Sequence, residues 1–239
     1  MICVRSGSLV TMTEGLNAYL LHHRAMKGSS TQVFFITRET GLVRAFCRAG
    51  RSKTMRATLQ PFTPLWLTTK TKHFGVQVDK VEVANPAHVL QQDGLIAGLY
   101  LNELLFKLLK PEGDDIELFG LYEQALRGLA LATTKPELEI CLRQFEFQLL
   151  EVLGYGPSFS EEADTGDAIQ ADKQYVFVPK EGFSEASVGI SGASILAIGN
   201  HAYAHREVLR DAKRITRMAI DALLDGEAIN TRELYVQVS

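Results

Sequence analysis

The sequence predicts an α+β protein of more than one domain, in which a five-stranded OB-fold barrel is followed by an all-helical domain. Three observations predict this. Short strand-like runs separated by glycine and proline fill residues 16–90, an apolar helix follows at 94–109, and most of the remaining chain has helical periodicity. The predicted boundaries are 1–13 for an extended or disordered lead, 14–90 for the barrel and 91–239 for the helical domain.

The N-terminal lead has no long apolar run, so we predict no signal peptide. Met12 lies just before the first strand-like run. Residues 1–11 are therefore either a disordered lead or the product of a start assigned too early.

Five strand-like runs, bounded by turn-forming residues, make up the barrel region. They lie at 16–24, 32–37, 42–49, 64–70 and 74–84. Alternation is clearest in the last run, where Phe74, Val76 and Val78 share one side of the strand. Five short strands are typical of a small closed barrel, for which we favour the OB-fold, with an SH3-like barrel as the competing interpretation.

The apolar helix at 94–109 is the first element of the second domain. Its apolar side chains lie on almost every side, which is typical of a buried helix. Asp93 is placed to cap its start, and Pro111 stops it. Asn102 and Glu103 interrupt the apolar run, and the helix is too short and too polar to span a bilayer.

Five further helices are predicted after it, at 114–132, 136–153, 193–203, 206–224 and 231–238. Pro136 suits a first helical turn, Gly154 suits a C-cap and Thr231 suits an N-cap. Residues 156–192 are rich in Gly, Ser, Asp and Glu, and we predict a loop-rich insertion that carries a small hairpin around 174–178.

Charge is divided unevenly along the chain, although the net charge is only −3. Residues 1–80 hold twelve Lys/Arg and three Asp/Glu, a balance of +9, whereas residues 81–239 hold thirteen and twenty-five, a balance of −12. Such asymmetry indicates a polyanion-binding domain joined to a domain of another kind.

The basic barrel is the predicted nucleic-acid-binding part, because long cationic side chains bind phosphates and nearby aromatic rings stack on bases. Arg44, Phe46 and Arg48 are two apart on a strand and therefore share one face. Phe62 and Trp66 are further aromatic candidates, and we expect both in the core. The competing interpretation is a solvated strand edge whose charge blocks aggregation. The predicted DNA-binding set is Arg24, Arg38, Arg44, Arg48, Arg51, Lys53 and Arg56.

Motifs of catalysis and of metal binding are not found. The chain has no GxSxG elbow, HExxH or P-loop, and its three cysteines form no CxxC pair, which fits a reducing cytoplasm. His201 and His205 are four apart, so a helix would place both on one face, but no third ligand follows at useful spacing. We therefore predict no catalytic residue, no metal and no cofactor.

Six stretches, taken together and in order, resemble the RecO family of recombination mediators. They are RAGRSK (48–53), TLQPFTPLWL (58–67), GLYLNELLFKLL (98–109), LRQFEFQLLEVLGYG (142–156), DAKRITRMA (211–219) and TRELY (231–235). Each motif alone is weak, but their order and spacing over almost the whole chain are specific. Some members of this family carry a four-cysteine zinc site after the GYG, whereas this chain has SFSEEADTGD there, so we predict no zinc.

The resemblance implies an N-terminal OB-fold, a helical C-terminal domain and a non-catalytic role in the cytoplasm, in association with the nucleoid and not with a membrane. Proteins of this family bind single- and double-stranded DNA and anneal complementary strands. With RecR they help to load RecA onto DNA coated by single-strand-binding protein. Two alternatives remain: an OB-fold RNA-binding, translation-associated module, and an enzyme with acids Asp164, Asp167 and Asp172 in the insertion.

The resemblance also implies that the helical domain binds the tail of single-strand-binding protein, which is acidic and ends in an apolar residue and a free carboxylate. Arg is suited to such a carboxylate because it binds bidentately. We place the site around Arg143 and the cationic face of the helix at 206–224, which stands out within an acidic domain. That face consists of Arg206, Arg210, Lys213, Arg214 and Arg217. Pairing of that face with acidic helices, and an intrahelical ion network of Arg143 with Glu139 and Glu146, are the competing interpretations. The predicted tail-binding set is Arg143, Arg210 and Arg214.

Overall fold

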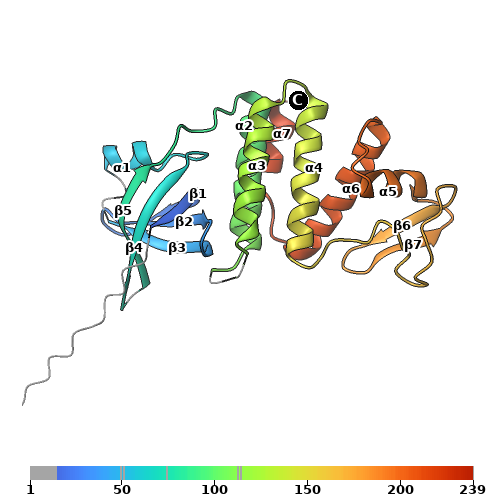
Figure 1. The fold of residues 1–239 in the computed structure, drawn as a ribbon, viewed down its shortest axis with the longest axis horizontal. Helices are drawn as coiled ribbons and strands as arrows, with labels where there is room; N and C mark the ends of the chain where they lie inside the picture. The colour runs from blue at the N-terminus through green and yellow to red at the C-terminus, as the bar shows by residue number, and fades with distance from the viewer. Residues whose placement is uncertain are drawn as a thin grey trace, which may run out of the picture. The chain divides into compact units, whose positions relative to one another are not determined.

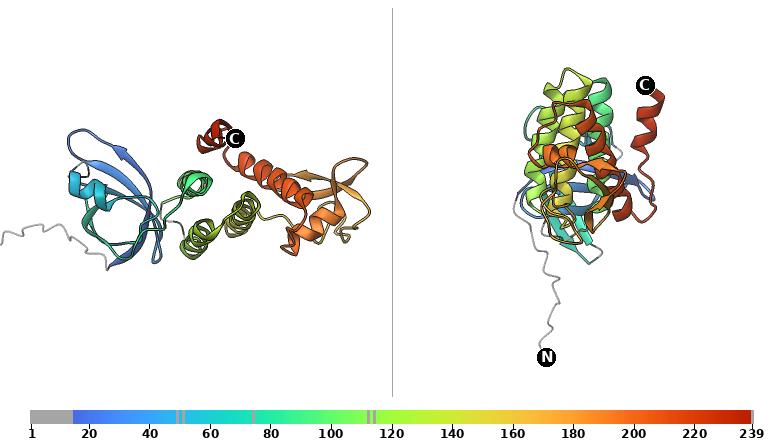
Figure 2. Two further views of the ribbon diagram at one scale, coloured as in Figure 1. Left: turned by 90° about the horizontal axis from the view of Figure 1, so that it is seen from above. Right: turned by 90° about the vertical axis from the view of Figure 1, so that its right-hand side faces the viewer.

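The computed structural model describes residues 15–238 apart from 49, 51, 74, 112 and 114, with side chains to residue 234. The predicted lead at 1–13 lies outside these residues. The chain forms two compact units. The first is the described part of Met1–Val89 with Leu109–Phe119, and the second is Leu90–Leu108 with Gly120–Ser239. Figures 1 and 2 show the elements of each unit.

The first unit is a closed barrel with the strand order β1-β2-β3-β5-β4. All pairs are antiparallel except β3 with β5, which is parallel, and β1 closes the barrel on β4. A short helix, α1 (Lys53–Thr58), connects β3 to β4 and starts at the N-cap Ser52. The strands are β1 (Leu16–Ala25), β2 (Thr31–Thr37), β3 (Gly41–Cys47), β4 (Leu65–Lys72) and β5 (Gly75–Val83). The predicted OB-fold barrel is confirmed, while α1 was not predicted.

Along each strand, alternate residues point inward and fill the barrel. Leu20 of β1, Phe35 of β2 and Leu67 of β4 are almost fully buried in one apolar cluster. The register of β1 against β2 shifts between Leu20 and His22, which is the signature of a β-bulge. The bulge decides which side chains beyond it face outward, and this sets the surface described below.

The second unit is built on helices. They are α2 (Gln92–Leu108), α3 (Glu117–Leu131), α4 (Lys135–Val152), α5 (Gly192–Gly199), α6 (Arg206–Leu223) and α7 (Thr231–Val238). Helix α2 packs on α4 and α7, and α4 packs on α6 (Figure 1). The predicted burial of α2 is confirmed, since Leu101, Leu104 and Leu105 are fully buried, although Leu95 is exposed.

The helix ends differ from two of the predictions. Helix α2 begins at Gln92, so Asp93 lies in its first turn and is not its cap. Thr231 is the first residue of α7, and the Glu103 carboxylate accepts the N–H groups of Thr231 and Asn230. Helix α4 begins as predicted near Pro136, within a capping box formed by its N-cap Thr134.

The insertion between α4 and α5 is a three-stranded antiparallel sheet with the order β7-β6-β8. Its strands are β6 (Gln174–Val178), β7 (Gly182–Ala186) and β8 (Ile190–Ser191), so the sheet has one strand more than the predicted hairpin. Phe159 packs edge-on against Phe147 of α4, with ring centroids 5.1 Å apart, and also contacts Phe183 of β7. Aromatic packing therefore joins the insertion to α4.

Within the described residues, every helix is too short or too polar to cross a membrane. The same part of the chain has no group of three or more His, Cys, Asp or Glu side chains placed to hold a metal ion. Cys47 and Cys141 are free thiols, and burial raises the pKa of each.

Candidate nucleic-acid interface and peptide pocket

The outer surface of β1, β2 and β3 presents side chains in rows that run across the strands. Cross-strand register places His22, Phe34 and Arg44 in one row. The next row places Arg24, Gln32 and Phe46 beside each other, and Phe46 is paired in turn with Gln77 of β5. Their neighbours Val33, Phe35 and Ala45 point into the core. We call the six side chains of β1 to β3 in these two rows the open face; Gln32 is the buried member of the set.

A third row on the same outer surface is covered. Tyr19, Ile36 and Leu42 pair across the strands and are buried. The Tyr19 ring contacts Phe119, with centroids 5.5 Å apart, and the Tyr19 hydroxyl is 3.2 Å from Nε2 of His88. The chain of the same unit thus closes one end of this surface and leaves the other end to solvent.

The open face combines cations with aromatic rings. His22, Arg24 and Arg44 are exposed, and Phe34 and Phe46 are half-buried. The rings of His22 and Phe34 are 6.0 Å apart, inclined at 47°, and Arg24 donates to the Gln32 side chain at 3.0 Å. None of the six side chains is acidic, so the face suits a polyanion.

Of the predicted DNA-binding residues, the structure brings Arg24 and Arg44 together on the open face. Arg48 follows β3, and Lys53 and Arg56 lie on α1, all three exposed. Arg38 is exposed just after β2, with its guanidinium 5.0 Å from the centre of the Phe119 ring. Arg51 lies outside the described residues.

Of the two aromatic residues predicted to lie in the core, one does and one does not. Phe62 is buried in the core, as predicted. The prediction for Trp66 is wrong: Leu65 and Leu67 take the inward positions of β4, so alternation turns Trp66 outward, where it is half-buried with Lys80 Nζ 5.5 Å from its ring. His22, Gln32 and Phe34 were missed. The alternation of QVFFIT contained the signal, because its two phenylalanines must face opposite sides.

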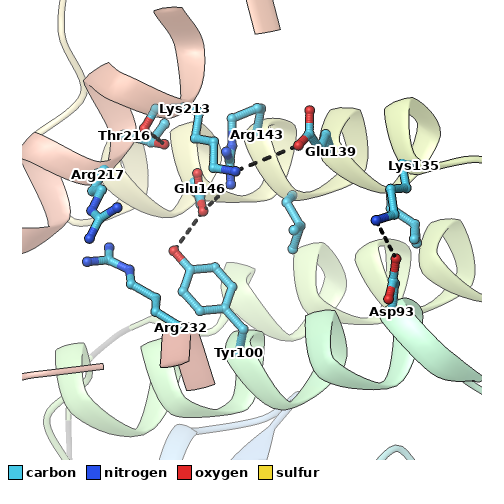
Figure 3. A pocket seen from close by; sticks show the side chains of 12 residues that line it. Asp93, Tyr100, Lys135, Glu139, Arg143, Glu146, Lys213, Thr216, Arg217 and Arg232 are labelled. Atoms are coloured by element: carbon cyan, nitrogen blue, oxygen red, sulfur yellow. Dashed lines mark hydrogen bonds and ion pairs between the residues drawn. The ribbon is translucent and has the colours of Figure 1, made fainter. Parts of the chain in front are cut away.

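The second unit contains a pocket of about 480 Å³ between α2, α4, α6 and α7 (Figure 3). Leu138 and Leu142 of α4 supply apolar wall. The polar residues that line it are Asp93, Tyr100, Lys135, Glu139, Arg143, Glu146, Lys213, Thr216, Arg217 and Arg232. Since Arg143 is the buried cation among them, we call it the Arg143 pocket.

Arg143 belongs to a buried three-residue network. Its Nη2 donates to Oε1 of Glu146 at 2.7 Å, and the Tyr100 hydroxyl donates to the same oxygen at 2.7 Å. The side chains of Arg143 and Glu146 are only 6% and 1% exposed. Burial, followed by the charge of Glu146, raises the pKa of Tyr100 well above its usual range, so this phenol remains a donor. The competing interpretation, an intrahelical ion network of Arg143, is therefore half present: Arg143 pairs with Glu146 in the interior, whereas Glu139 pairs instead with Lys213.

Three polar atoms beside this network are buried without a hydrogen-bond partner among the described residues. They are Arg143 Nε, Glu146 Oε2 and the Tyr203 hydroxyl. Burial raises the pKa of Tyr203, which lies near enough to Arg143 and Glu146 to feel both charges. An unpaired guanidinium N–H leaves Arg143 with capacity for a further acceptor.

The rim of the pocket carries further cations. Lys213 is 3.7 Å from Glu139, and Lys135 is 3.8 Å from Asp93. Arg217 and Arg232, which lie at one end of the pocket (Figure 3), both form ion pairs with Asp221. Rim cations thus sit in partly exposed ion pairs, which an acidic ligand can enter at little cost.

Of the predicted tail-binding residues, only Arg143 lines this pocket. Arg210 is exposed and pairs with Glu207 and Asp211 of its own helix, and Arg214 is exposed and does not line the pocket either. His201 and His205 are not on one helix, because α5 ends at Gly199 and α6 begins at Arg206. Lys213 and Arg217 line the pocket and belong to the cationic face of α6 beside which the site was predicted, whereas Tyr100, Lys135 and Arg232 were missed.

An OB-fold barrel with a cationic and aromatic face, joined to a helical domain, has the architecture of a nucleic-acid-binding protein. Residues 12–87 match the family described as Recombination protein O N terminal, and residues 91–233 match Recombination protein O C terminal. The chain therefore belongs to the RecO family of DNA repair proteins, as the sequence motifs predicted.

Individual relatives agree over nearly the full length. DNA repair protein RecO of Legionella pneumophila (strain Paris) is 37% identical over 224 residues, which cover 93% of this chain and 98% of that protein. The corresponding protein of Hahella chejuensis is 38% identical over 222 residues, covering 91% and 92%. That of Pasteurella multocida is 35% identical over 225 residues, covering 92% and 93%. These matches favour a DNA repair protein over a translation-associated RNA-binding module.

Proposed function

We propose that this protein is a recombination mediator that combines DNA binding in its barrel with protein binding in its helical domain. The barrel binds single- and double-stranded DNA and anneals complementary strands. The helical domain holds the C-terminal tail of single-strand-binding protein, and with RecR the protein helps to load RecA onto DNA coated by that protein. It works in the cytoplasm, in association with the nucleoid.

The observation that carries the proposal is the Arg143 pocket. A tail that ends in an apolar residue and a free carboxylate needs an apolar slot with a cation at its base. Leu138 and Leu142 supply the slot, and Arg143 supplies a buried guanidinium with an unpaired Nε. Lys213 and Arg217 at the rim match the acidic residues that precede the terminal residue.

Tail binding is tested with a labelled peptide of that chemistry, by fluorescence anisotropy. Arg217→Glu should weaken the peptide more than tenfold, because it reverses a rim charge without touching the buried network. Arg210→Glu is the matched control on the same helix, since Arg210 is similarly exposed and does not line the pocket. A peptide with an amidated C-terminus should also bind more than tenfold weaker. The proposal would be contradicted if Arg217→Glu bound the peptide as tightly as wild type does and if amidation of the peptide left its affinity unchanged.

DNA binding is tested through its salt dependence. Arg44→Gln and Arg48→Gln should each flatten the slope of log affinity against log salt, by about 0.7 for every phosphate of a single strand that the variant no longer neutralises. Arg127→Gln is the control, because Arg127 is exposed on α3 and pairs with Glu123. Unchanged slopes in the first two variants would show that Arg44 and Arg48 do not contact DNA phosphates. Binding of the tail peptide should persist in all three variants.

A further inference from the structure

We propose that the open face is a subsite for unpaired nucleobases, in which Phe34 and Phe46, with His22 beside Phe34, stack on the faces of bases. The inference rests on the DNA binding proposed above and goes beyond it. Phosphate contacts do not distinguish paired from unpaired strands, whereas stacking on a protein ring requires a free base face.

The first argument is position. Phe34 on β2 and Phe46 on β3 are diagonal neighbours on the outer surface, about 7–8 Å apart. Each ring is half-buried and therefore partly accessible. In the neighbouring row, by contrast, Tyr19 and Ile36 are fully buried.

The second argument is the backbone beneath Phe46. Gly75 has a φ of +111°, a conformation that L side chains rarely adopt, and a Cβ placed on it would lie 3.3 Å from the Phe46 ring. The ring thus lies across the glycine at the start of β5. A glycine at this point lets the ring pack low on the sheet surface, where its other side is available to a ligand.

The third argument is the arrangement of the polar neighbours. Phe34 is paired with Arg44 across the strands, and Phe46 is flanked by Gln32 and Gln77. Arg24 holds Gln32 by a 3.0 Å hydrogen bond at the end of the second row. Cations beside rings allow a single strand to place its phosphates on Arg and its bases on the rings, while the half-buried Gln77 offers an amide to base edges. An apolar protein partner would not use this concentration of positive charge.

The experiment compares three ligands of equal length at fixed salt: oligothymidylate, an abasic oligonucleotide with the same phosphates, and a duplex. The variants are Phe34→Leu and Phe46→Leu, which keep apolar bulk without a ring, and Phe34→Tyr, which keeps the ring. Tyr155→Leu is the control, because Tyr155 is an exposed aromatic outside the barrel. Circular dichroism and melting temperature establish that each variant is folded.

The expected result is a loss of about fivefold or more in oligothymidylate affinity for each Leu variant, since one stacked base contributes on that scale. Abasic and duplex affinities, and the salt slope, should stay within about twofold of wild type, as should Phe34→Tyr on all ligands. On wild-type protein, an oligonucleotide carrying 2-aminopurine should change its emission at saturation, and this readout needs no variant.

Equal losses on oligothymidylate and the abasic strand, or unchanged affinity in both Leu variants, would overturn the subsite, as would unchanged 2-aminopurine emission at saturation. In those cases wild-type binding to the abasic strand would still support the proposed phosphate contacts. If wild-type protein binds none of the three ligands, the proposed DNA binding itself is wrong and the subsite falls with it.

Discussion

Replacement of Arg143 by Met should destabilise the helical unit strongly, although Met is apolar and similar in length. Arg143 is 6% exposed and its partner Glu146 is 1% exposed. Once the guanidinium is removed, the buried Glu146 carboxylate retains, among the described residues, the Tyr100 hydroxyl as its one side-chain donor. Loss of one member of a buried ion pair costs about 3–5 kcal/mol, most of it the penalty of leaving the other charge uncompensated.

The magnitude is measurable by urea denaturation. With a dependence of about 2 kcal/mol per molar urea, the midpoint should fall by about 1.5–2.5 M. Two probes separate the units: far-UV circular dichroism is dominated by the helices, whereas the single tryptophan, Trp66, reports on the barrel. We expect the dichroism transition to move and the Trp66 fluorescence transition to stay.

A combined variant supplies the control. Arg143→Met with Glu146→Leu and Tyr100→Phe removes every polar member of the network, and replacement of a buried ion pair by apolar groups of similar volume is often neutral or stabilising. The combined variant should regain most of the lost stability and still fail to bind the tail peptide. If Arg143→Met alone costs less than about 1 kcal/mol, the pair is solvated and the argument for a desolvated network fails.

Three further predictions concern stability and metal. Glu103→Gln should lower the free energy of unfolding by about 0.5–2 kcal/mol at neutral pH. Burial raises the pKa of Glu103, but the hydrogen bonds from the Thr231 and Asn230 N–H groups outweigh burial and lower it. A carboxylate with a lowered pKa stabilises the fold at pH values above its pKa in the unfolded chain, so the melting temperatures of wild type and variant should converge as pH falls below about 4. Gly128→Ala should destabilise by about 1–3 kcal/mol in urea, because its Cβ would lie 2.7 Å from Cys141 Sγ, and Cys141→Ala should reverse the loss; no rescue would place the strain elsewhere. Elemental analysis should find no stoichiometric zinc and a chelator should leave the melting temperature unchanged; about one equivalent of zinc would contradict this.

The strands and long helices could be predicted because their evidence is local. The run at 174–178 matches β6 residue for residue, and the ends of the five barrel strands agree within about two residues. Helix α1 was missed since six residues show too little periodicity, and only the N-cap Ser52 marked it. Trp66 was misplaced because a large aromatic suggests a core position, whereas the alternation of LWL already required it to face outward.

The pocket could not be predicted, because its residues come together only through tertiary packing. Tyr100 and Glu146 are 46 residues apart in sequence, yet share a hydrogen bond. Arg143 and Glu146 are three apart on one helix, a spacing that usually marks an exposed pair. Their burial depends on α2 and α6 packing against α4, and no property of α4 alone reveals it.

A desolvated ion pair is a poor way to stabilise a helical unit, and this points to a role for Arg143 beyond the fold. Apolar residues of equal volume would contribute at least as much stability, without the desolvation penalty. What they would not provide is a guanidinium held in a fixed orientation beside an apolar slot. Glu146 and Tyr100 fix Arg143 through one shared oxygen, while its Nε remains unpaired. The network therefore has the form that the proposed tail binding needs, in which a preorganised guanidinium donates to the terminal carboxylate of the tail.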